Sequence, residues 1–271
     1  MDVMFLGAAR EVTGSSFLVT IQGRHVLVDH GMEQGKDIYL NRELPLPPHE
    51  LDALVLTHAH IDHSGMVPAL VKQGFRGTIH ATPATQMLCD IMLRDSAHIQ
   101  EMEAEWRNRK AERAGELPVE PAYTQQDAET ALRLFQALPY GEKREILPGC
   151  VLHYTDAGHL LGSASASLEL YEDDLKKTLV FSGDIGNINQ PIIKDPQYLS
   201  EADFVVMESS YGDRLHGERP DYIQDLVDTL QTTFDRGGNV VIPSFAVGRS
   251  QEVLYFLRAA HREGEIGRAH V

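Results

Sequence analysis

Thr57-His58-Ala59-His60-Ile61-Asp62-His63 is the stretch that predicts both the fold and the chemistry of this chain. It directly follows Leu54-Val55-Leu56, an apolar run typical of a buried strand. His58 and His60 are two residues apart, so in extended backbone their side chains point to the same side. Both are therefore placed to bind one metal ion after the end of the strand.

The second half of the stretch indicates a second ion. Asp62 and His63 follow where Ser64-Gly65 suggests that the chain turns into a helix, so their side chains point in another direction. Neutral imidazole nitrogens and carboxylate oxygens are ordinary zinc ligands, and ligands this close leave room for a bound water. A histidine-rich polar loop is the alternative interpretation, and this spacing argues against it.

Composition places the chain among ordinary globular proteins. Of its residues, 42% are hydrophobic and 24% are charged. A length of 271 residues is enough for one large domain, or for one domain and a fragment of another. No apolar run reaches the roughly 20 residues that span a bilayer, and the N-terminus lacks a basic leader. Cys89 and Cys150 match no metal or redox spacing. We therefore expect a cytoplasmic protein without a membrane segment.

The net charge bears on possible partners. With 24 basic and 40 acidic residues the formal charge is −16, which argues against a broad basic face for phosphate backbones. Two divalent ions would add local positive charge that this count leaves out. A nucleic-acid substrate is therefore restricted to a local groove and is not excluded.

Further segments carry polar residues where strands end. They are Val28-Asp29-His30, Asp156-Ala157-Gly158-His159, Phe181-Ser182-Gly183-Asp184, Met207-Glu208 and Pro243-Ser244-Phe245-Ala246-Val247-Gly248-Arg249. Together with the opening stretch they resemble the metallo-β-lactamase superfamily, and within it the β-CASP nucleases. That branch includes the endonuclease of pre-messenger-RNA cleavage and ribonuclease J.

The resemblance implies a ligand set. His58, His60 and His159 would bind a first zinc ion, Asp62 and His63 a second, and Asp184 would bridge the two. Asp29 would support the site from behind, although alone it also suits a turn before glycine. His153 is an alternative to His159, but it lies inside an expected strand.

The resemblance also assigns residues outside the ligand set. Asp62 would orient the attacking water as well as bind metal, and Glu208 would act with a histidine supplied later in the chain. Ser244 and Arg249 would bind substrate phosphate before a helix N-terminus, although a capping loop with a surface arginine has the same pattern.

We expect an α/β fold, the αββα sandwich of the superfamily, with the start of an inserted α/β β-CASP domain. Residues 1–208 would form the metallo-β-lactamase-like domain, and residues 209–265 would form the beginning of the β-CASP domain. Residues 266–271 would be a tail foreign to the protein. Helices are expected over 64–73, 82–113, 124–138 and 221–235. Strands are expected at 5–8, 15–21, 25–29, 78–80, 151–155, 164–170, 178–182, 202–208 and 239–242.

The resemblance favours a zinc-dependent ribonuclease that cleaves single-stranded RNA, with two Zn²⁺ and a homodimer for the full-length protein. A glyoxalase II-like thioester hydrolase and a non-catalytic subunit of an RNA-processing complex are alternatives. Two later histidine motifs of the branch have no counterpart after Gln251. We therefore expect an N-terminal portion whose second zinc site is incomplete, inactive alone or at least about a hundredfold slower than the full-length protein.

Overall fold

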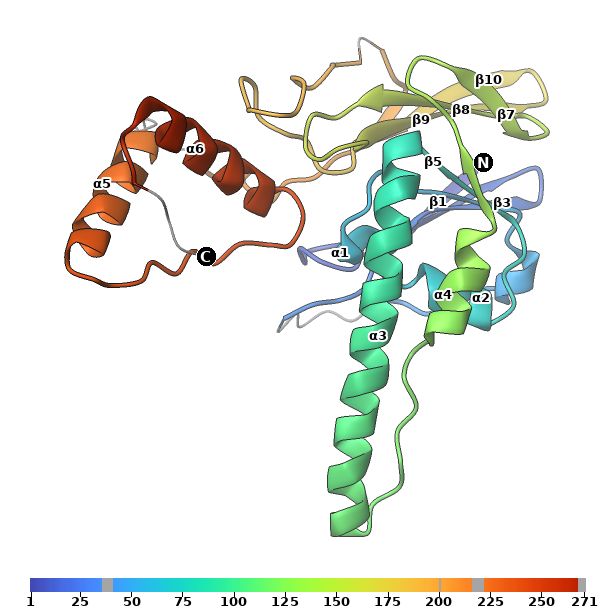
Figure 1. The fold of residues 1–271 in the computed structure, drawn as a ribbon. Coiled ribbons are helices and arrows are strands. Elements are labelled where there is room, and N and C mark those ends of the chain that lie inside the picture. Colours follow the sequence, from blue (N-terminus) through green and yellow to red (C-terminus); the bar gives the residue numbers. More distant parts are fainter. Residues whose placement is uncertain (36–40, 200, 216–221, 268–271) are drawn as a thin grey trace. The chain divides into compact units, whose positions relative to one another are not determined.

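Two β-sheets form the centre of the larger of two units in the chain (Figure 1). The computed structural model describes residues 1–35, 41–199, 201–215 and 222–267. Unit 1 comprises Met1–Ile188 with Asp195–Glu208, and unit 2 comprises Asn189–Lys194 with Ser209–Val271. Each unit is described by itself.

The first sheet has six strands in the order β1-β2-β3-β4-β5-β6. β1 to β3 are antiparallel, and β3 to β6 are parallel. Alternation along β3 sends Val26 and Val28 toward the second sheet and Leu27 toward the helices. The strands are β1 Asp2–Gly7, β2 Ser16–Ile21, β3 Arg24–His30, β4 Ala53–Val55, β5 Thr78–Ala81 and β6 Phe135–Ala137.

The second sheet has five strands in the order β11-β10-β9-β8-β7. Its large side chains, Tyr154, Leu168 and Phe181, fill the core between the two sheets. β7 is Lys143–Leu147, β8 Cys150–Asp156, β9 Ala164–Glu172, β10 Leu175–Phe181 and β11 Phe204–Val206. The expected α/β class, with paired sheets and packed helices, is confirmed.

The helices of unit 1 pack on the six-stranded sheet through a second core that includes Leu54, Leu70 and Leu93. They are α1 Ile61–Ser64, α2 Val67–Lys72, α3 Pro83–Ala114 and α4 Gln125–Leu132, with a 3₁₀ turn at Pro48–Glu50. The Thr82 side chain caps α3, and Gly115 ends it in the left-handed conformation. The C-terminal end of α3 extends well past the sheets (Figure 1).

Three expected elements differ from the structure. The helix expected over 64–73 forms only as α2, from Val67 to Lys72, and the preceding Met66 N–H instead donates to the His30 carbonyl at 2.9 Å. The helix expected over 124–138 ends at Leu132, and Phe135 pairs with Ile79 in a parallel ladder. In the described part of unit 2 no strand forms at 239–242, where Val241 is exposed.

Unit 2 contains α5 Tyr222–Asp235 and α6 Arg249–Glu263. Val227, Leu230, Ala260 and Ile266 form its small core. Ile266, the first residue of the expected foreign tail, therefore packs inside the unit. Asp221 and residues 268–271 lie outside the described residues. None of the described helices is long and apolar enough to cross a membrane.

Candidate metal centre

Four of the predicted ligands lie on the segment that runs from the end of β4 into α1. His58 follows β4, His60 is the residue immediately before α1, and Asp62 and His63 lie within α1. His58 and His63 are almost fully buried, with side-chain exposures of 1% and 5%. The short strand followed directly by a short helix therefore turns the four side chains toward one region.

The other two ligands come from loops that follow β8 and β10. In the first loop the Ser163 hydroxyl accepts hydrogen bonds from the His159 and Leu160 amides, each at 3.0 Å. The second loop carries Asp184 and is joined to the first where Gly186 N–H donates to Ala157 O at 2.9 Å. This backbone contact places His159 and Asp184 side by side.

Three histidines and one carboxylate oxygen form a compact group. His60 Nδ1 lies 3.1 Å from His58 Nε2 and 3.2 Å from His159 Nε2. Asp184 Oδ2 lies 3.4 Å from His159 Nε2 and 3.8 Å from His58 Nε2. A tetrahedral zinc ion with bonds of about 2.0–2.1 Å separates its ligand atoms by about 3.3 Å. The donor set therefore fits zinc in both chemistry and spacing.

The second oxygen of Asp184 faces a different pair of residues. Asp184 Oδ1 lies 3.3 Å from His63 Nε2, which is itself 3.9 Å from Asp62 Oδ2. The structure thus brings all six predicted residues together, with one Asp184 oxygen toward each of two ligand groups. The side chains of Asp184 and His159 are partly exposed, at 30% and 28%, whereas His58 and His63 are almost fully buried.

Asp29 stands behind the cluster, at the end of β3. Its Oδ1 accepts from the Thr57 amide, and its Oδ2 accepts from the Thr57 hydroxyl and from His63 Nδ1, all at 2.8 Å. The backbone of Asp29 is left-handed, with a φ of 55° that aspartate tolerates better than most residues. Its side chain therefore fixes the His63 ring so that Nε2 points at the cluster.

Burial and neighbouring groups shift the pKa values of the clustered histidines in two opposite directions. Burial, followed by the charges of neighbouring histidines, lowers the pKa of His58 well below its usual value and that of His60 to about 4. Burial also acts to lower the pKa of His63, but hydrogen bonds to Asp184 and Asp29 outweigh it and hold that pKa well above normal. His58 and His60 are therefore neutral and ready to ligate near neutral pH.

The two aspartates are shifted in opposite directions. Burial, together with the nearby Asp184 charge, raises the pKa of Asp62 despite the attraction of His63. Burial opposes ionisation of Asp184 too, but His63 and the other histidines outweigh it and lower its pKa. Of these two carboxylates, Asp184 is consequently the more readily ionised, and it lies between the two ligand groups.

Sequence reasoning missed two polar residues at the centre. Thr57 joins Asp29 to His58, with its Oγ1 at 3.1 Å from His58 Nδ1. Ser15 Oγ lies 3.5 Å from His63 Nε2, and the Ser15 amide donates to Asp62 O at 2.9 Å. Thr57 was visible at the start of the motif, whereas nothing local distinguishes Ser15 from any serine before a strand.

Glu208 lies close to the metal loop. Its Oε1 accepts from the Ile185 amide at 2.9 Å, and its own amide donates to Ser182 Oγ at 3.1 Å. Ser244 and Arg249 belong to unit 2, where Arg249 Nη1 pairs with Glu252 Oε2 at 2.8 Å. The alternative histidine, His153, lies in β8 opposite Lys143 and Ser167, outside the cluster.

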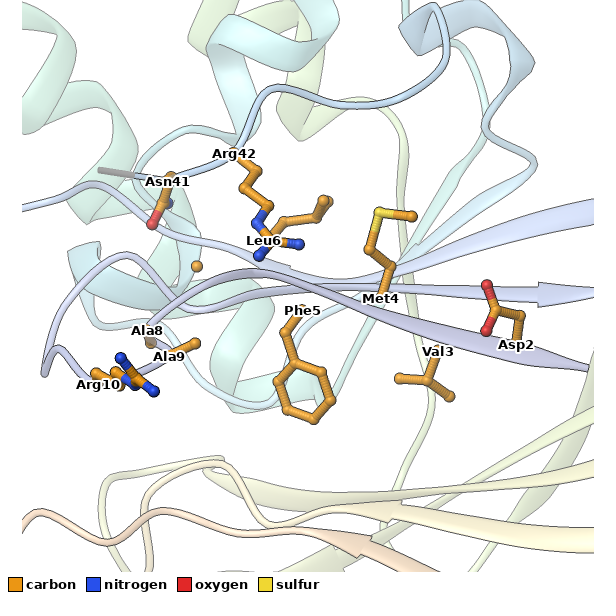
Figure 2. Close-up of a pocket in the computed structure, with 11 residues that line it drawn as sticks. Asp2, Val3, Met4, Phe5, Leu6, Ala8, Ala9, Arg10, Asn41 and Arg42 are labelled. Atoms are coloured by element: carbon orange, nitrogen blue, oxygen red, sulfur yellow. The ribbon is translucent and has the colours of Figure 1, made fainter. Parts of the chain in front are cut away.

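An open pocket of about 740 Å³ follows β1 on the edge of the first sheet. Figure 2 shows Phe5 on one side of the strand and Leu6 with Arg42 on the other. Asp2 to Arg10, Asn41 and Arg42 line this pocket, and none of the six predicted ligands does. It is therefore a feature separate from the metal centre.

Comparison with known proteins finds relatives that are at least 30% identical to this chain. It is 39% identical over 258 residues to ribonuclease TTHA0252 of Thermus thermophilus, covering 95% of this chain and 54% of that protein. It is 31% identical to the transcription termination factor FttA of Methanocaldococcus jannaschii, covering 97% of this chain and 40% of the factor. The chain thus spans about half the length, or less, of these relatives.

A solved metallo-β-lactamase of Cronobacter sakazakii is 16% identical with a TM-score of 0.45, over 97% of this chain and 85% of that one. Residues 9–244 match the family described as the metallo-beta-lactamase superfamily. That match extends over most of the chain and includes all six residues of the cluster. The chain belongs to the metallo-β-lactamase superfamily.

Proposed function

We propose that the chain is part of a cytoplasmic, zinc-dependent ribonuclease that hydrolyses phosphodiester bonds in single-stranded RNA. The position of Asp184 carries the proposal, because its two oxygens face two ligand groups at 3.3–3.8 Å. His58, His60 and His159 would hold one ion with Asp184, and Asp62 and His63 a second with the same carboxylate. When bound, two zinc ions polarise a phosphodiester and lower the pKa of water toward neutrality.

Two acidic residues would act on the substrate side. Asp62 is one-fifth exposed, with Oδ2 turned toward His63, so it can both hold an ion and accept a hydrogen bond from an attacking water. Glu208 uses Oε1 to hold the Ile185 amide, and its Oε2 has no hydrogen bond among the described residues. In the proposed enzyme, that second oxygen would orient a proton donor.

Substrate phosphate would be bound by residues of unit 2. The α6 N-terminus follows Gly248, and Arg249 is two-thirds exposed while it pairs with Glu252. A helix N-terminus with an arginine suits a phosphate oxygen. Ser244 is exposed five residues earlier, within the segment that resembles the β-CASP signature. We infer that unit 2 is the beginning of a β-CASP cap.

The relatives favour RNA over a thioester as substrate, since one is named a ribonuclease and the other a transcription termination factor. The histidine-rich loop itself is common to the β-CASP ribonucleases and to the glyoxalase II-like thioester hydrolases, so it does not distinguish them. Only the segments around Glu208 and Arg249 distinguish the β-CASP proposal from a glyoxalase II-like enzyme.

The test compares two substrates under enzyme excess, which detects slow turnover. We expect zinc-dependent cleavage of a labelled single-stranded RNA and no hydrolysis of a glutathione thioester. Asp62→Asn should lower RNA cleavage at least about a hundredfold. His98→Ala, an exposed histidine on α3, is the matched control and should keep full activity. Thioester hydrolysis without RNA cleavage, or no zinc bound at all, would overturn the proposal.

A further inference from the structure

The loop that carries His159 is held by the start of helix α3. Thr82 Oγ1 donates a hydrogen bond to the Gly162 carbonyl at 2.7 Å, and Thr85 Oγ1 donates to the same oxygen at 2.8 Å. Both threonines are almost fully buried. The Thr82 hydroxyl also accepts from the Thr85 amide, so it caps the helix and holds the loop at once. One loop carbonyl therefore receives two hydroxyl donors from a distant part of the sequence.

The Gly162 backbone permits this close approach. It is left-handed, with a φ of 83°, and a Cβ there would lie 2.4 Å from the Thr85 nitrogen and 2.8 Å from Thr82 Oγ1. Ser163 follows directly, and its hydroxyl accepts from the His159 amide at 3.0 Å. The two threonines are therefore connected to His159 by a short and tightly folded piece of chain.

This contact joins parts of the ligand set that come from different sheets. His58 and His60 follow β4 of the first sheet, whereas His159 lies between β8 and β9 of the second. Thr82 comes directly after β5, which pairs in parallel with β4. His60 Nδ1 and His159 Nε2 lie 3.2 Å apart across this junction. The bond between Thr82 and Gly162 therefore fixes the third histidine relative to the first two.

The direction of the Thr85 hydroxyl departs from the usual pattern in a helix. A helical threonine commonly donates to the carbonyl three or four residues earlier, as Thr130 of α4 does to Gln126 at 2.8 Å. The carbonyl four residues before Thr85 belongs to Ala81, and it accepts from the Leu138 amide at 2.9 Å. The Thr85 hydroxyl is instead directed at the loop, so its role lies outside its own helix.

We propose that Thr85 and Thr82 are positioning residues for the first zinc ion. They hold the Gly162 carbonyl and thereby keep the His159 ring within reach of the other two histidines. The inference rests on the proposed two-zinc centre, and both threonines act through His159, not on the metal itself. A ligand that is already in place loses less freedom when the ion binds. Release of the loop should therefore lower the affinity for zinc.

Zinc affinity of the full chain tests the positioning role. Thr85→Val keeps the shape of the side chain and removes one donor, while the Gly162 carbonyl retains its bond from Thr82, so the fold should persist. We expect the affinity of the first site for zinc to fall about 10–100-fold and that of the second to change less than about threefold. Competition with a chromophoric chelator measures both affinities.

Two further variants isolate the hydroxyl as the cause. Thr85→Ser retains the donor and should bind zinc as the original chain does. Thr130→Val makes the same chemical change where the hydroxyl bonds within its own helix, and it is the matched control that should bind both ions normally. A merely structural role for Thr85 would lower the thermal stability of the metal-free chain without a preference for the first site.

Hydrogen exchange of the metal-free chain gives a second readout that does not depend on zinc. The His159 and Leu160 amides both donate to Ser163 Oγ, so their protection reports whether the loop is held. In Thr85→Val these two amides should exchange at least about tenfold faster, while the amides of α4 keep their rates. Unchanged exchange of the two loop amides would rule out the positioning role.

The zinc titration separates failure of this inference from failure of the proposed function. A Thr85→Val variant that binds the first ion as tightly as the original chain, or that loses both ions equally, would rule out positioning and leave the two-zinc centre in place. An original chain that binds no zinc would overturn the centre, and the positioning role with it.

Discussion

Asp29 shows how a single buried carboxylate controls the centre at the residue scale. It receives hydrogen bonds from the Thr57 amide, the Thr57 hydroxyl and His63 Nδ1, so neither of its oxygens is left unsatisfied. Because His63 donates from Nδ1, its Nε2 is the nitrogen directed at Asp184. One side chain thereby selects both the tautomer and the orientation of a proposed ligand.

Replacing Asp29 with Asn should therefore weaken the second zinc ion selectively. The amide nitrogen of asparagine donates hydrogen bonds and accepts none, so in the place of Oδ2 it cannot accept from the Thr57 hydroxyl or from His63 Nδ1, and the His63 ring loses its support. We expect zinc affinity at the second site to fall about 10–100-fold while the first site changes little. Competition titration with a chromophoric chelator resolves the two sites. Equal losses at both sites would show that Asp29 acts on the whole fold.

Asp184 and His63 should differ in how many ions they affect. Asp184 faces both ligand groups, so Asp184→Ala should weaken both zinc sites together. His63 belongs to one group, so His63→Ala should leave the first ion bound. Elemental analysis after gel filtration gives the number of zinc ions per chain. The same loss of one ion from both variants would contradict a bridging Asp184.

Sequence was most informative where ligands are close along the chain. Four of the predicted ligands lie within His58–His63 and can be recognised from sequence, because their spacing has few structural explanations. His159 and Asp184 were assigned through resemblance, since a single histidine or aspartate in a glycine-rich loop has many uses. Ser15 could not be found, because its approach to His63 depends on how β2 and α1 meet in space.

At the scale of elements, two close backbone approaches hold the ligand loops together. A Cβ on Gly31 would lie 1.6 Å from the Asp62 carbonyl oxygen, and one on Gly186 would lie 1.6 Å from the Gly158 carbonyl oxygen. Neither obstacle is a side chain that could rotate away. These two glycines therefore let β3 approach α1, and the Asp184 loop approach the His159 loop.

Gly186→Ala should separate the two loops and reduce zinc binding at the first site. Displacing well-packed backbone costs about 1–3 kcal/mol, so a modest loss of stability should accompany the loss of metal. Asn187→Ala, one residue further and exposed, is the control. Thermal unfolding with and without zinc measures both effects. A Gly186→Ala variant that binds two ions with normal affinity would show that the loops can separate without cost.

Elements that depend on distant pairing were the ones that sequence misjudged. Residues 124–138 have apolar spacing that suits a helix, and Thr124 does form the expected cap, with Asp127 completing a capping box. The chain nevertheless leaves the helix, because β5 offers Phe135 an unpaired edge. Conversely, Val240-Val241-Ile242 has strand composition, but the described part of unit 2 contains no strand to pair with it.

For the whole molecule, the distribution of apolar cores separates the two units. Unit 1 has two extensive cores, one between its sheets and one beneath its helices. In the described part of unit 2, four buried residues form a core around Val227 and Leu230. So small a core supports little independent stability. All six residues of the metal centre lie in unit 1.

Zinc should consequently stabilise one unit and not the other. A ligand that binds only the folded state at a hundred times its Kd adds about 2.7 kcal/mol, which for a domain of this size raises Tm by roughly 5–10 °C. We expect this shift in the unfolding of unit 1, while α5 and α6 of unit 2 exchange their amide hydrogens at the same rate with and without zinc. Hydrogen exchange followed by peptide mass spectrometry reports each unit separately, and Asp184→Ala provides the zinc-insensitive reference. Equal protection of both units by zinc would mean that they unfold as one, because a ligand can slow exchange only in segments whose opening it opposes.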